Sequence, residues 1–143
     1  MPKRILCATD ASKASRKAVA CAVDLAKSTG AKLSFLTVDL MPATRMRKTY
    51  FWDQKLVDAG AAQMNEALRG AIRAGARAGL ADLPCIIVAG HNAADAIVAY
   101  ADGNDFDHIV VGSSVRNALD RLLVGSVATA VVTRAHCPVT VAR

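Results

Sequence analysis

The sequence predicts an α/β fold: a single domain over residues 1–143, built on a five-stranded parallel open sheet with helices on both faces. Short apolar runs of strand length alternate with longer amphipathic segments, which is typical of parallel strands joined by crossover helices. The chain has 143 residues, a usual length for one domain. Hydrophobic residues make up 53% of it but aromatic residues only 4%, so Ala, Val, Ile and Leu must form most of the core.

The N-terminal part of the chain predicts two strands with a helix between them. Residues 5–9 are an apolar run without alternation, which indicates a strand buried on both faces. Residues 10–12 interrupt this run with capping side chains. Apolar positions at helical spacing then predict a helix over 12–29, with Gly30 at its C-terminus. Residues 33–38 form the second apolar run of strand length.

The segment 39–53 is predicted to be a long irregular connection, and connections of this length often have a function of their own. It contains a short basic cluster and the aromatic triplet at residues 50–52. Asp53 is placed to cap a second helix that reaches about residue 78. The inner apolar stripe of this helix is predicted at Leu56, Met64, Leu68 and Ile72.

The C-terminal part continues the alternation. Residues 84–89 are predicted as a third strand, because proline is tolerated at the first position of a strand. Asn92 is placed to begin a helix that Gly103 ends. The remaining elements are a strand over 108–111, a loop over 113–124, a helix over 125–135 and a strand over 138–142. Regular alternation of this kind implies a mostly parallel sheet.

Composition restricts the partners. The formal net charge of +6 is compatible with nucleic acid, anionic lipid or a nucleotide. Few aromatic residues are available for stacking on bases, which disfavours a platform for single-stranded nucleic acid. No apolar run approaches the ~18 residues of a membrane span, and the N-terminus lacks the apolar stretch of a signal peptide. We therefore expect a cytoplasmic protein with neither nucleic acid nor membrane as its partner.

The cysteines and histidines predict no metal site. The four cysteines form no Cys-x-x-Cys motif, so we expect buried free thiols in a reducing compartment. The three histidines are separated by whole strand-and-helix units, which favours isolated turn or surface histidines over metal ligands. These residues are Cys7, Cys21, Cys85, Cys137, His91, His108 and His136.

Polar or glycine residues follow three of the predicted strands. Open parallel sheets bind ligands beyond the C-terminal ends of their strands, where the strand order reverses. Asp10 follows the first strand, Asp39 follows the second, and Gly112 ends the fourth. Gly112 permits a sharp turn and the close approach of a ligand, and Ser113 adds a hydroxyl group.

A second glycine turn lies nearby in the sequence. Gly125 and Ser126 open a predicted helix, where free N–H groups and the helix dipole favour an anion. The two turns together predict a site for a phosphate-bearing ligand. The alternative is that Gly112 is only a turn and Ser126 only a helix cap.

Three stretches of the chain resemble the universal stress protein family. Residues 112–128 read GSSVRNALDRLLVGSVA, and residues 136–141 read HCPVTV. Residues 5–12, ILCATDAS, look like the first strand of that family and its Asp-x-Ser turn. The order of elements matches over essentially the whole chain. The resemblance implies a Rossmann-like sheet of the adenine nucleotide alpha hydrolase-like kind and a role in the stress response.

The phosphate-holding motif of the family is present here with one departure. Members that hold ATP carry Gly-x-x-Gly, nine further residues, and then Gly-Ser or Gly-Thr. Gly112 matches the first glycine, and the nine residues 116–124 precede Gly125. Val115 stands where the second glycine is expected. A β-branched residue resists positive φ and places a side chain near the phosphates, so the sequence lies between members that hold ATP and members that do not.

The resemblance assigns a role to each part of the site. Asp10 would face the ribose and adenosine end, and the backbone of Val38 would meet the adenine. The resemblance does not imply a role for Arg116, which we add from this sequence. It would reach a phosphate and partly replace what Val115 removes, or else it is a solvated loop arginine. The positions implied around the phosphates are Gly112, Ser113, Val115, Gly125, Ser126 and Val127.

The function expected from these features is that of a regulatory stress-response dimer that binds an adenine nucleotide, ATP with or without Mg²⁺. The chain contains no Walker lysine motif, Gly-x-Ser-x-Gly elbow or His-Glu-x-x-His motif, so we assign no catalytic residue. The last strand should form a sheet edge, and the resemblance implies a homodimer through Val139 and Val141. A nucleotide-free interaction module of the same fold and a slow ATP hydrolase are the alternatives.

Overall fold

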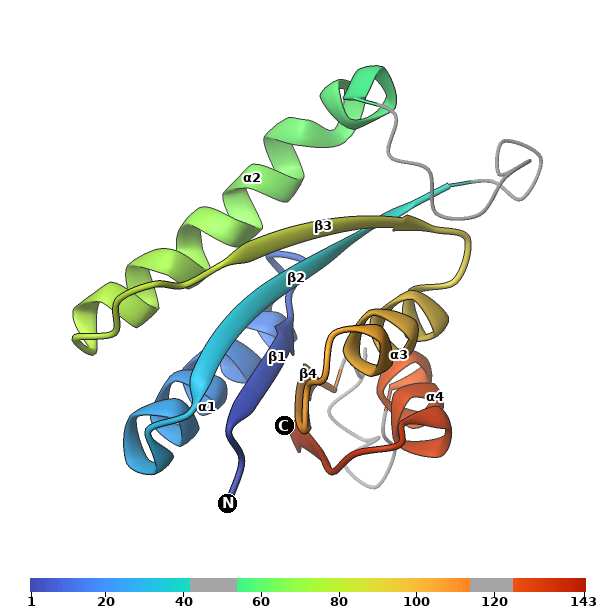
Figure 1. Ribbon diagram of the computed structural model, residues 1–143. Helices are drawn as coiled ribbons and strands as arrows, with labels where there is room; N and C mark the ends of the chain where they lie inside the picture. Colours follow the sequence, from blue (N-terminus) through green and yellow to red (C-terminus); the bar gives the residue numbers. More distant parts are fainter. Residues whose placement is uncertain (42–53, 114–124) are drawn as a thin grey trace.

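The structure is a computed structural model that describes residues 1–41, 54–113 and 125–143, and the side chains of 54–65 are not described. It confirms the predicted fold class: five parallel strands form one sheet in the order β3-β2-β1-β4-β5 (Figure 1). The strands are β1 (Arg4–Ala8), β2 (Lys32–Leu40), β3 (Cys85–Gly90), β4 (His108–Gly112) and β5 (Val139–Ala142). The helices are α1 (Lys13–Thr29), α2 (Gln54–Arg77), α3 (Ala93–Gly103) and α4 (Ser126–Arg134).

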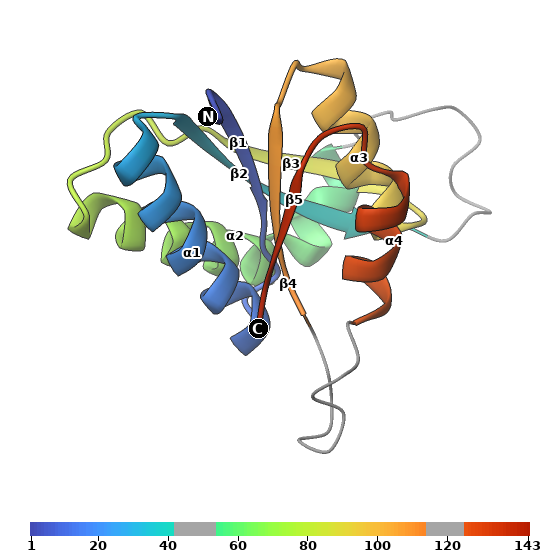
Figure 2. The same cartoon turned by 90° about the horizontal axis from the view of Figure 1, so that it is seen from below.

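Helices cover both faces of the sheet, as predicted. Figure 2 shows α1 and α2 on one side of the strands and α3 and α4 on the other. Ile5 and Cys7 point into the core beneath α1 and α2, whereas Leu6 between them packs under α3 and α4. Successive side chains of a strand point to opposite faces, and both faces are covered here. This explains why residues 5–9 are apolar without alternation.

The ends of α1 follow the sequence signals. The hydroxyl oxygen of Ser12 accepts a hydrogen bond from the N–H of Ser15 at 3.1 Å and caps the helix. Gly30 ends the helix in the left-handed region, with φ of 74°. Between these caps, small apolar side chains let the helix lie close to the sheet. The fully or nearly fully buried ones are Ala18, Val19, Ala22, Val23 and Ala26.

The inner stripe predicted for α2 is correct at Leu68 but wrong at Ile72. Leu68 is buried together with Ala67 and Ala71, whereas 41% of Ile72 is exposed. The helix therefore turns its small residues toward the sheet and α1, and leaves the larger side chain outside. Strand β2 extends to Leu40, so it includes the first residues of the predicted connection 39–53. Asp53 lies outside the described residues, as do the side chains of Leu56 and Met64.

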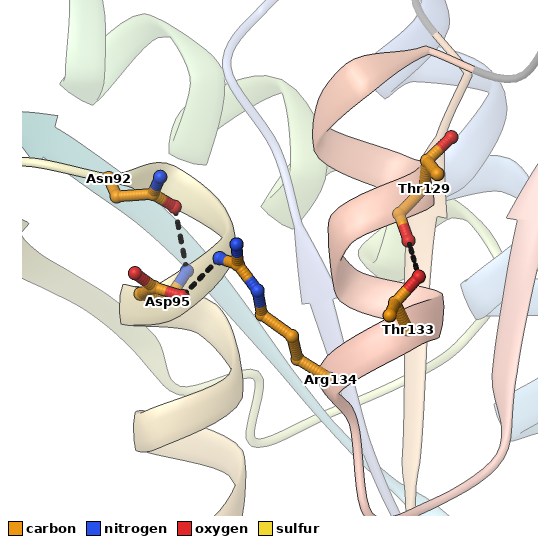
Figure 3. Close-up of polar contacts among 5 residues, drawn as sticks. All are labelled: Asn92, Asp95, Thr129, Thr133 and Arg134. Atoms are coloured by element: carbon orange, nitrogen blue, oxygen red, sulfur yellow. Dashed lines mark hydrogen bonds and ion pairs between the residues drawn. The ribbon is translucent and has the colours of Figure 1, made fainter.

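The other layer is joined by contacts between α3 and α4 (Figure 3). Asn92 caps α3 as predicted, because its Oδ1 accepts a hydrogen bond from the N–H of Asp95 at 3.0 Å. Arg134 in the last turn of α4 forms an ion pair with Asp95. Beyond α4, Nδ1 of His136 lies 2.7 Å from Oδ2 of Asp102. The pairs Arg134–Asp95 and His136–Asp102 are both exposed, so each adds little to the free energy of unfolding. Their main effect is to position α4 against α3.

The cysteines differ from the expectation. All four are free thiols, but only Cys7 is buried; Cys21 and Cys137 are half-buried and Cys85 is exposed. Burial raises the pKa of the Cys7 thiol far above its usual range, so this group stays protonated and unreactive. The exposed thiol of Cys85 lies at the first position of β3.

Strand β3 begins at Cys85, one residue later than predicted. The carbonyl of the preceding residue, Pro84, still accepts a hydrogen bond from the N–H of Phe35 in β2.

Candidate functional site

The strand order places the candidate site between β1 and β4. From β1 the chain adds β2 and β3 on one side of the sheet, and then β4 and β5 on the other. This is the reversal at which open parallel sheets bind ligands. A cavity of about 200 Å³ lies there, at the C-terminal ends of the strands. It is lined by Ala8, Thr9, Asp10, Ser12, Ala14, Ser15, Leu36, Val38, Leu40, Ala93, Ile97, Val111, Gly112, Gly125, Val127 and Ala128.

Asp10 lies on the β1 side of the cavity and is held by a hydrogen-bonded turn. Its Oδ1 accepts from the N–H of Ser12 at 3.0 Å and from the hydroxyl of Ser15 at 2.6 Å. The N–H of Asp10 in turn donates to Oγ of Ser15 at 3.0 Å. Partial burial acts to raise the pKa of the Asp10 carboxyl, but these hydrogen bonds outweigh it and hold the pKa below its usual value.

The free oxygen of Asp10 is the acceptor that a ligand can use. Within the described part of the chain, the N–H of Ser12 and the hydroxyl of Ser15 both donate to Oδ1, so Oδ2 is available to a ligand. The turn that orients it is strained, since Ala11 has φ of 69°. An alanine in the left-handed region costs about 1–2 kcal/mol, and strain of this kind is concentrated at ligand-binding sites.

Gly112 is needed for a different reason from the one predicted. It is the last residue of β4, pairs with Ala142 of β5, and does not adopt positive φ. A Cβ atom added to it would collide with the backbone carbonyl of Ala14, in the first turn of α1. The prediction of a sharp turn at Gly112 is therefore wrong. The glycine instead allows the N-terminus of α1, which carries Ser15, to lie against the end of β4.

The β4 side of the cavity presents the N-terminus of α4. Gly125 occupies the N-cap position, where it has no side chain of its own to cap the helix. The N–H of Gly125 donates to the hydroxyl oxygen of Ser113 at 3.2 Å, which ties the end of β4 to the start of α4. The N–H groups of the next residues, Ser126 to Ala128, lack intrahelical acceptors because they belong to the first turn. With the helix dipole, they offer a binding site for an anion.

The wall between these two polar ends is apolar. Val38 and Leu36 face the cavity from β2, and Ile97 faces it from α3. Asp39 does not line the cavity, because alternate residues of a strand point to opposite faces. The prediction of a polar site feature at Asp39 is therefore wrong. Leu40 and Val127 line the opening and are 63% and 43% exposed, which leaves apolar surface for a ligand to cover.

Most of the predicted site residues meet here. Asp10, Val38, Gly112, Gly125 and Val127 line the cavity. Ser113 and Ser126 adjoin it through the contacts described above. Val115 and Arg116 lie outside the described residues.

Sequence reasoning missed two polar residues of the lining, Thr9 and Ser15. They are only 6% and 8% exposed. Thr9 directly precedes Asp10, and Ser15 lies one helical turn after the Ser12 cap. A hydroxyl on the inner face of an otherwise apolar helix was the signal that could have identified Ser15.

Three other observations concern the described part of the chain. A larger open cavity, of about 840 Å³, lies at the opposite end of the sheet, beside Arg4, Lys32 and the loop 80–84. It is away from the ends of strands at which parallel sheets bind ligands, so we favour the smaller cavity. Among residues 1–41, 54–113 and 125–143, no three His, Cys, Asp or Glu side chains are grouped to hold a metal ion. No helix within those residues has the length and hydropathy to cross a membrane.

Comparison with known proteins gives a consistent result. A universal stress protein of Methanocaldococcus jannaschii is 29% identical over 99% of this chain and 82% of its own length. The solved structure of UspA from Lactobacillus plantarum is 29% identical, with a TM-score of 0.77 over 99% of this chain and 97% of that one. A universal stress protein crystallised in complex with cAMP is also 29% identical, with a TM-score of 0.74 over the same shares of the two chains.

The family comparison covers the whole sequence. The sequence profile of the universal stress protein family matches residues 1–143. The match includes both halves of the cavity, the turn after β1 and the segment from β4 to α4. This chain belongs to the universal stress protein family.

Proposed function

We propose that this chain binds an adenine nucleotide, with ATP as the expected ligand, in the cavity between β1 and β4. One observation carries the proposal: a single space joins a carboxylate oxygen, an apolar wall and a helix N-terminus whose N-cap residue is a glycine. An adenine nucleotide has three matching parts, namely a ribose with hydroxyl donors, an apolar base and an anionic phosphate. The related universal stress protein crystallised with cAMP supports the same ligand class.

Each part of the nucleotide has a place in the cavity. The ribose hydroxyls would donate to Oδ2 of Asp10, whose low pKa keeps it ionised at neutral pH. The base would lie against Val38 and Ile97. The phosphates would accept hydrogen bonds from the N–H groups at the start of α4. Mg²⁺, where present, would be bound mainly through the phosphate oxygens and water.

The proposed role is regulatory rather than catalytic. Among the described lining residues, the hydroxyl of Ser15 and the carboxylate of Asp10 are hydrogen-bonded to each other and hold the turn after β1, so we assign the site to holding a ligand. Binding would stabilise the folded state and shift the population of the loops that surround the phosphates. A slow ATP hydrolase is the alternative within the same site, and a phosphate-release time course at the background rate would rule it out.

The proposal includes a homodimer through β5. This strand is at one edge of the sheet, and Val139 and Val141 are half-buried there. Pairing with the same strand of a second copy would bury them and satisfy the free backbone groups of the edge. Sedimentation is expected to give a dimer at micromolar concentration, and a monomer at that concentration would contradict the proposal.

Nucleotide titration tests the proposal directly. ATP with Mg²⁺ is expected to raise the free energy of unfolding by about 2.7 kcal/mol at a hundredfold excess over its Kd, measured by thermal shift. Val115→Gly should tighten ATP binding, because it removes a β-branched side chain from the loop next to the phosphates. Adenosine is the control for this variant, since it has no phosphate and its affinity should not change.

The titration also separates the two classes of function. Stabilisation by ATP that exceeds stabilisation by adenosine, and that a pyrimidine nucleotide does not reproduce, would support the proposal. If no adenine nucleotide stabilises the protein at millimolar concentration, the chain is a nucleotide-free interaction module. An unchanged ATP affinity in Val115→Gly would show that residue 115 does not obstruct the phosphates.

A further inference from the structure

The positive charge of the molecule is concentrated on one face. Helix α1 carries four basic residues and one acidic residue, and α2 carries four basic and two acidic residues, so this layer has an excess of five positive charges. The two helices cover the same face of the sheet (Figures 1 and 2). Helices α3 and α4 together carry two acidic residues and one basic residue. Of the net charge of +6, this layer therefore carries +5, α3 and α4 together carry −1, and the strands and connecting segments carry the remaining +2.

Three arginines form a row along the outside of α2. Arg69, Arg73 and Arg77 are all exposed and are spaced four residues apart. We call this row, together with Ile72, the arginine stripe. Four residues of α-helix rise about 6 Å, so the guanidinium groups lie on one side of the helix at roughly that interval. Like charges at this spacing repel each other, and the repulsion is relieved when an anionic partner binds.

These arginines have no partner within the described part of the chain. The ion pairs found there join Arg134 with Asp95 and His136 with Asp102, both on the opposite face. Glu66 lies one turn before Arg69, and it forms no ion pair with the stripe among the described residues. The arginine stripe therefore has hydrogen-bond donors and charge available for another molecule.

Ile72 adds an apolar contact to the stripe. Its side chain is 41% exposed and lies between Arg69 and Arg73 in the sequence. An apolar side chain flanked by arginines is a typical composition of a protein–protein contact, in which arginine is enriched. A phosphate backbone makes little use of an apolar group, and a single isoleucine adds little affinity for a bilayer. The combination therefore favours a protein partner over nucleic acid or membrane.

We propose that the arginine stripe docks an acidic amphipathic helix of another protein. A helix with carboxylates at every fourth residue presents them at the same interval of about 6 Å. Each carboxylate can accept two parallel hydrogen bonds from the planar guanidinium group of one arginine. An apolar residue between them would cover Ile72. Among the described helices, a second copy of this chain does not offer such a row, because the two acidic residues of α3, Asp95 and Asp102, are seven residues apart and already pair with Arg134 and His136.

A designed peptide probes this surface with the full-length protein. The probe is a labelled helical peptide with glutamate at every fourth position and a leucine on the same face, and its control has glutamine in place of glutamate. Fluorescence anisotropy is expected to show binding of the glutamate peptide that weakens as salt is raised. The triple variant R69Q/R73Q/R77Q should bind roughly tenfold more weakly. Ile72→Ser should weaken binding at both low and high salt.

A matched variant separates the stripe from net charge. K13Q/K17Q/K27Q removes the same charge from α1, and it should change the affinity by less than about threefold. R69K/R73K/R77K keeps the charge but loses the fork, and it should bind more weakly than the unaltered protein. Circular dichroism verifies that each variant is folded, as expected for exposed helix positions where glutamine and lysine are good helix formers.

Three results would overturn the proposal. Equal losses in the α1 and α2 triple variants would show attraction by net charge alone. An unchanged affinity in R69Q/R73Q/R77Q would place the peptide elsewhere on the protein. Tighter binding of duplex DNA or of phosphatidylserine vesicles, with the same dependence on the three arginines, would show that the stripe serves a phosphate surface instead.

Discussion

Gly112→Ala is expected to lower the free energy of unfolding by about 1–3 kcal/mol and to weaken nucleotide binding at the same time. The added methyl group would meet the carbonyl of Ala14, which is backbone and cannot rotate away. The first turn of α1 must then move, and it carries the hydroxyls of Ser12 and Ser15 that orient Asp10. Urea unfolding measures the first effect, and calorimetric titration with ATP measures the second.

Gly70→Ala is the matched control for this variant. Gly70 lies inside α2, and a Cβ added there would have nothing within 4 Å. The same chemical change should therefore stabilise the protein by up to about 1 kcal/mol, because alanine is the better helix former. Changes of opposite sign in the free energy of unfolding would confirm that close packing at Gly112, and not the loss of a glycine as such, causes the destabilisation. A Gly112→Ala protein as stable as the wild type would contradict the tight contact with α1.

Asp10→Ala is expected to weaken adenine nucleotide binding roughly 10- to 100-fold, the usual loss for a hydrogen bond to a charged group. The substitution removes the free Oδ2 and also the acceptor that orders the turn at Ser12 and Ser15. Calorimetric titration with ATP and with adenosine should show a loss of similar size, because the lost contact is to the ribose. A loss for ATP alone would instead place Asp10 near the phosphates.

Asp39→Ala is the control for Asp10→Ala. It removes the same side chain from the neighbouring strand, at a residue that does not line the cavity, and should leave the affinity for ATP unchanged.

The Asp10 carboxyl also predicts that the free energy of unfolding depends on pH, since hydrogen bonds lower the pKa of this group in the folded state below 3.8. Its contribution to stability is present above the unfolded pKa and is lost as the pH falls through the folded pKa. The stabilities of wild type and Asp10→Ala should therefore differ at neutral pH and converge in acid.

Local signals in the sequence were sufficient for most of the fold. The cap at Ser12, the left-handed glycine at position 30 and the cap at Asn92 each predicted a helix end that the structure contains. The unbroken apolar run of β1 predicted burial on both faces. Such features depend on a few consecutive residues, so a single sequence contains the information for them.

Features that depend on packing between distant segments could not be predicted in the same way. α2 is rich in alanine and glycine, so its periodicity does not fix which side faces the sheet, and Ile72 was placed on the wrong side. At Gly112 the sequence predicts a turn, whereas the structure shows close packing, because the contact with Ala14 joins residues far apart in the chain. The two ends of the cavity were predicted separately, and only the order of strands brings them together.

The central position of β1 also bears on the order in which the molecule is assembled. β1 is the first strand to be synthesised, yet its second edge is paired only when β4 follows ~100 residues later, as in the register of Ile5 with His108. Until then, the emerging chain has an open apolar edge at its centre, a state prone to aggregation. A ligand that contacts both Asp10 and Gly125 can therefore bind only a chain whose last third has been made and folded.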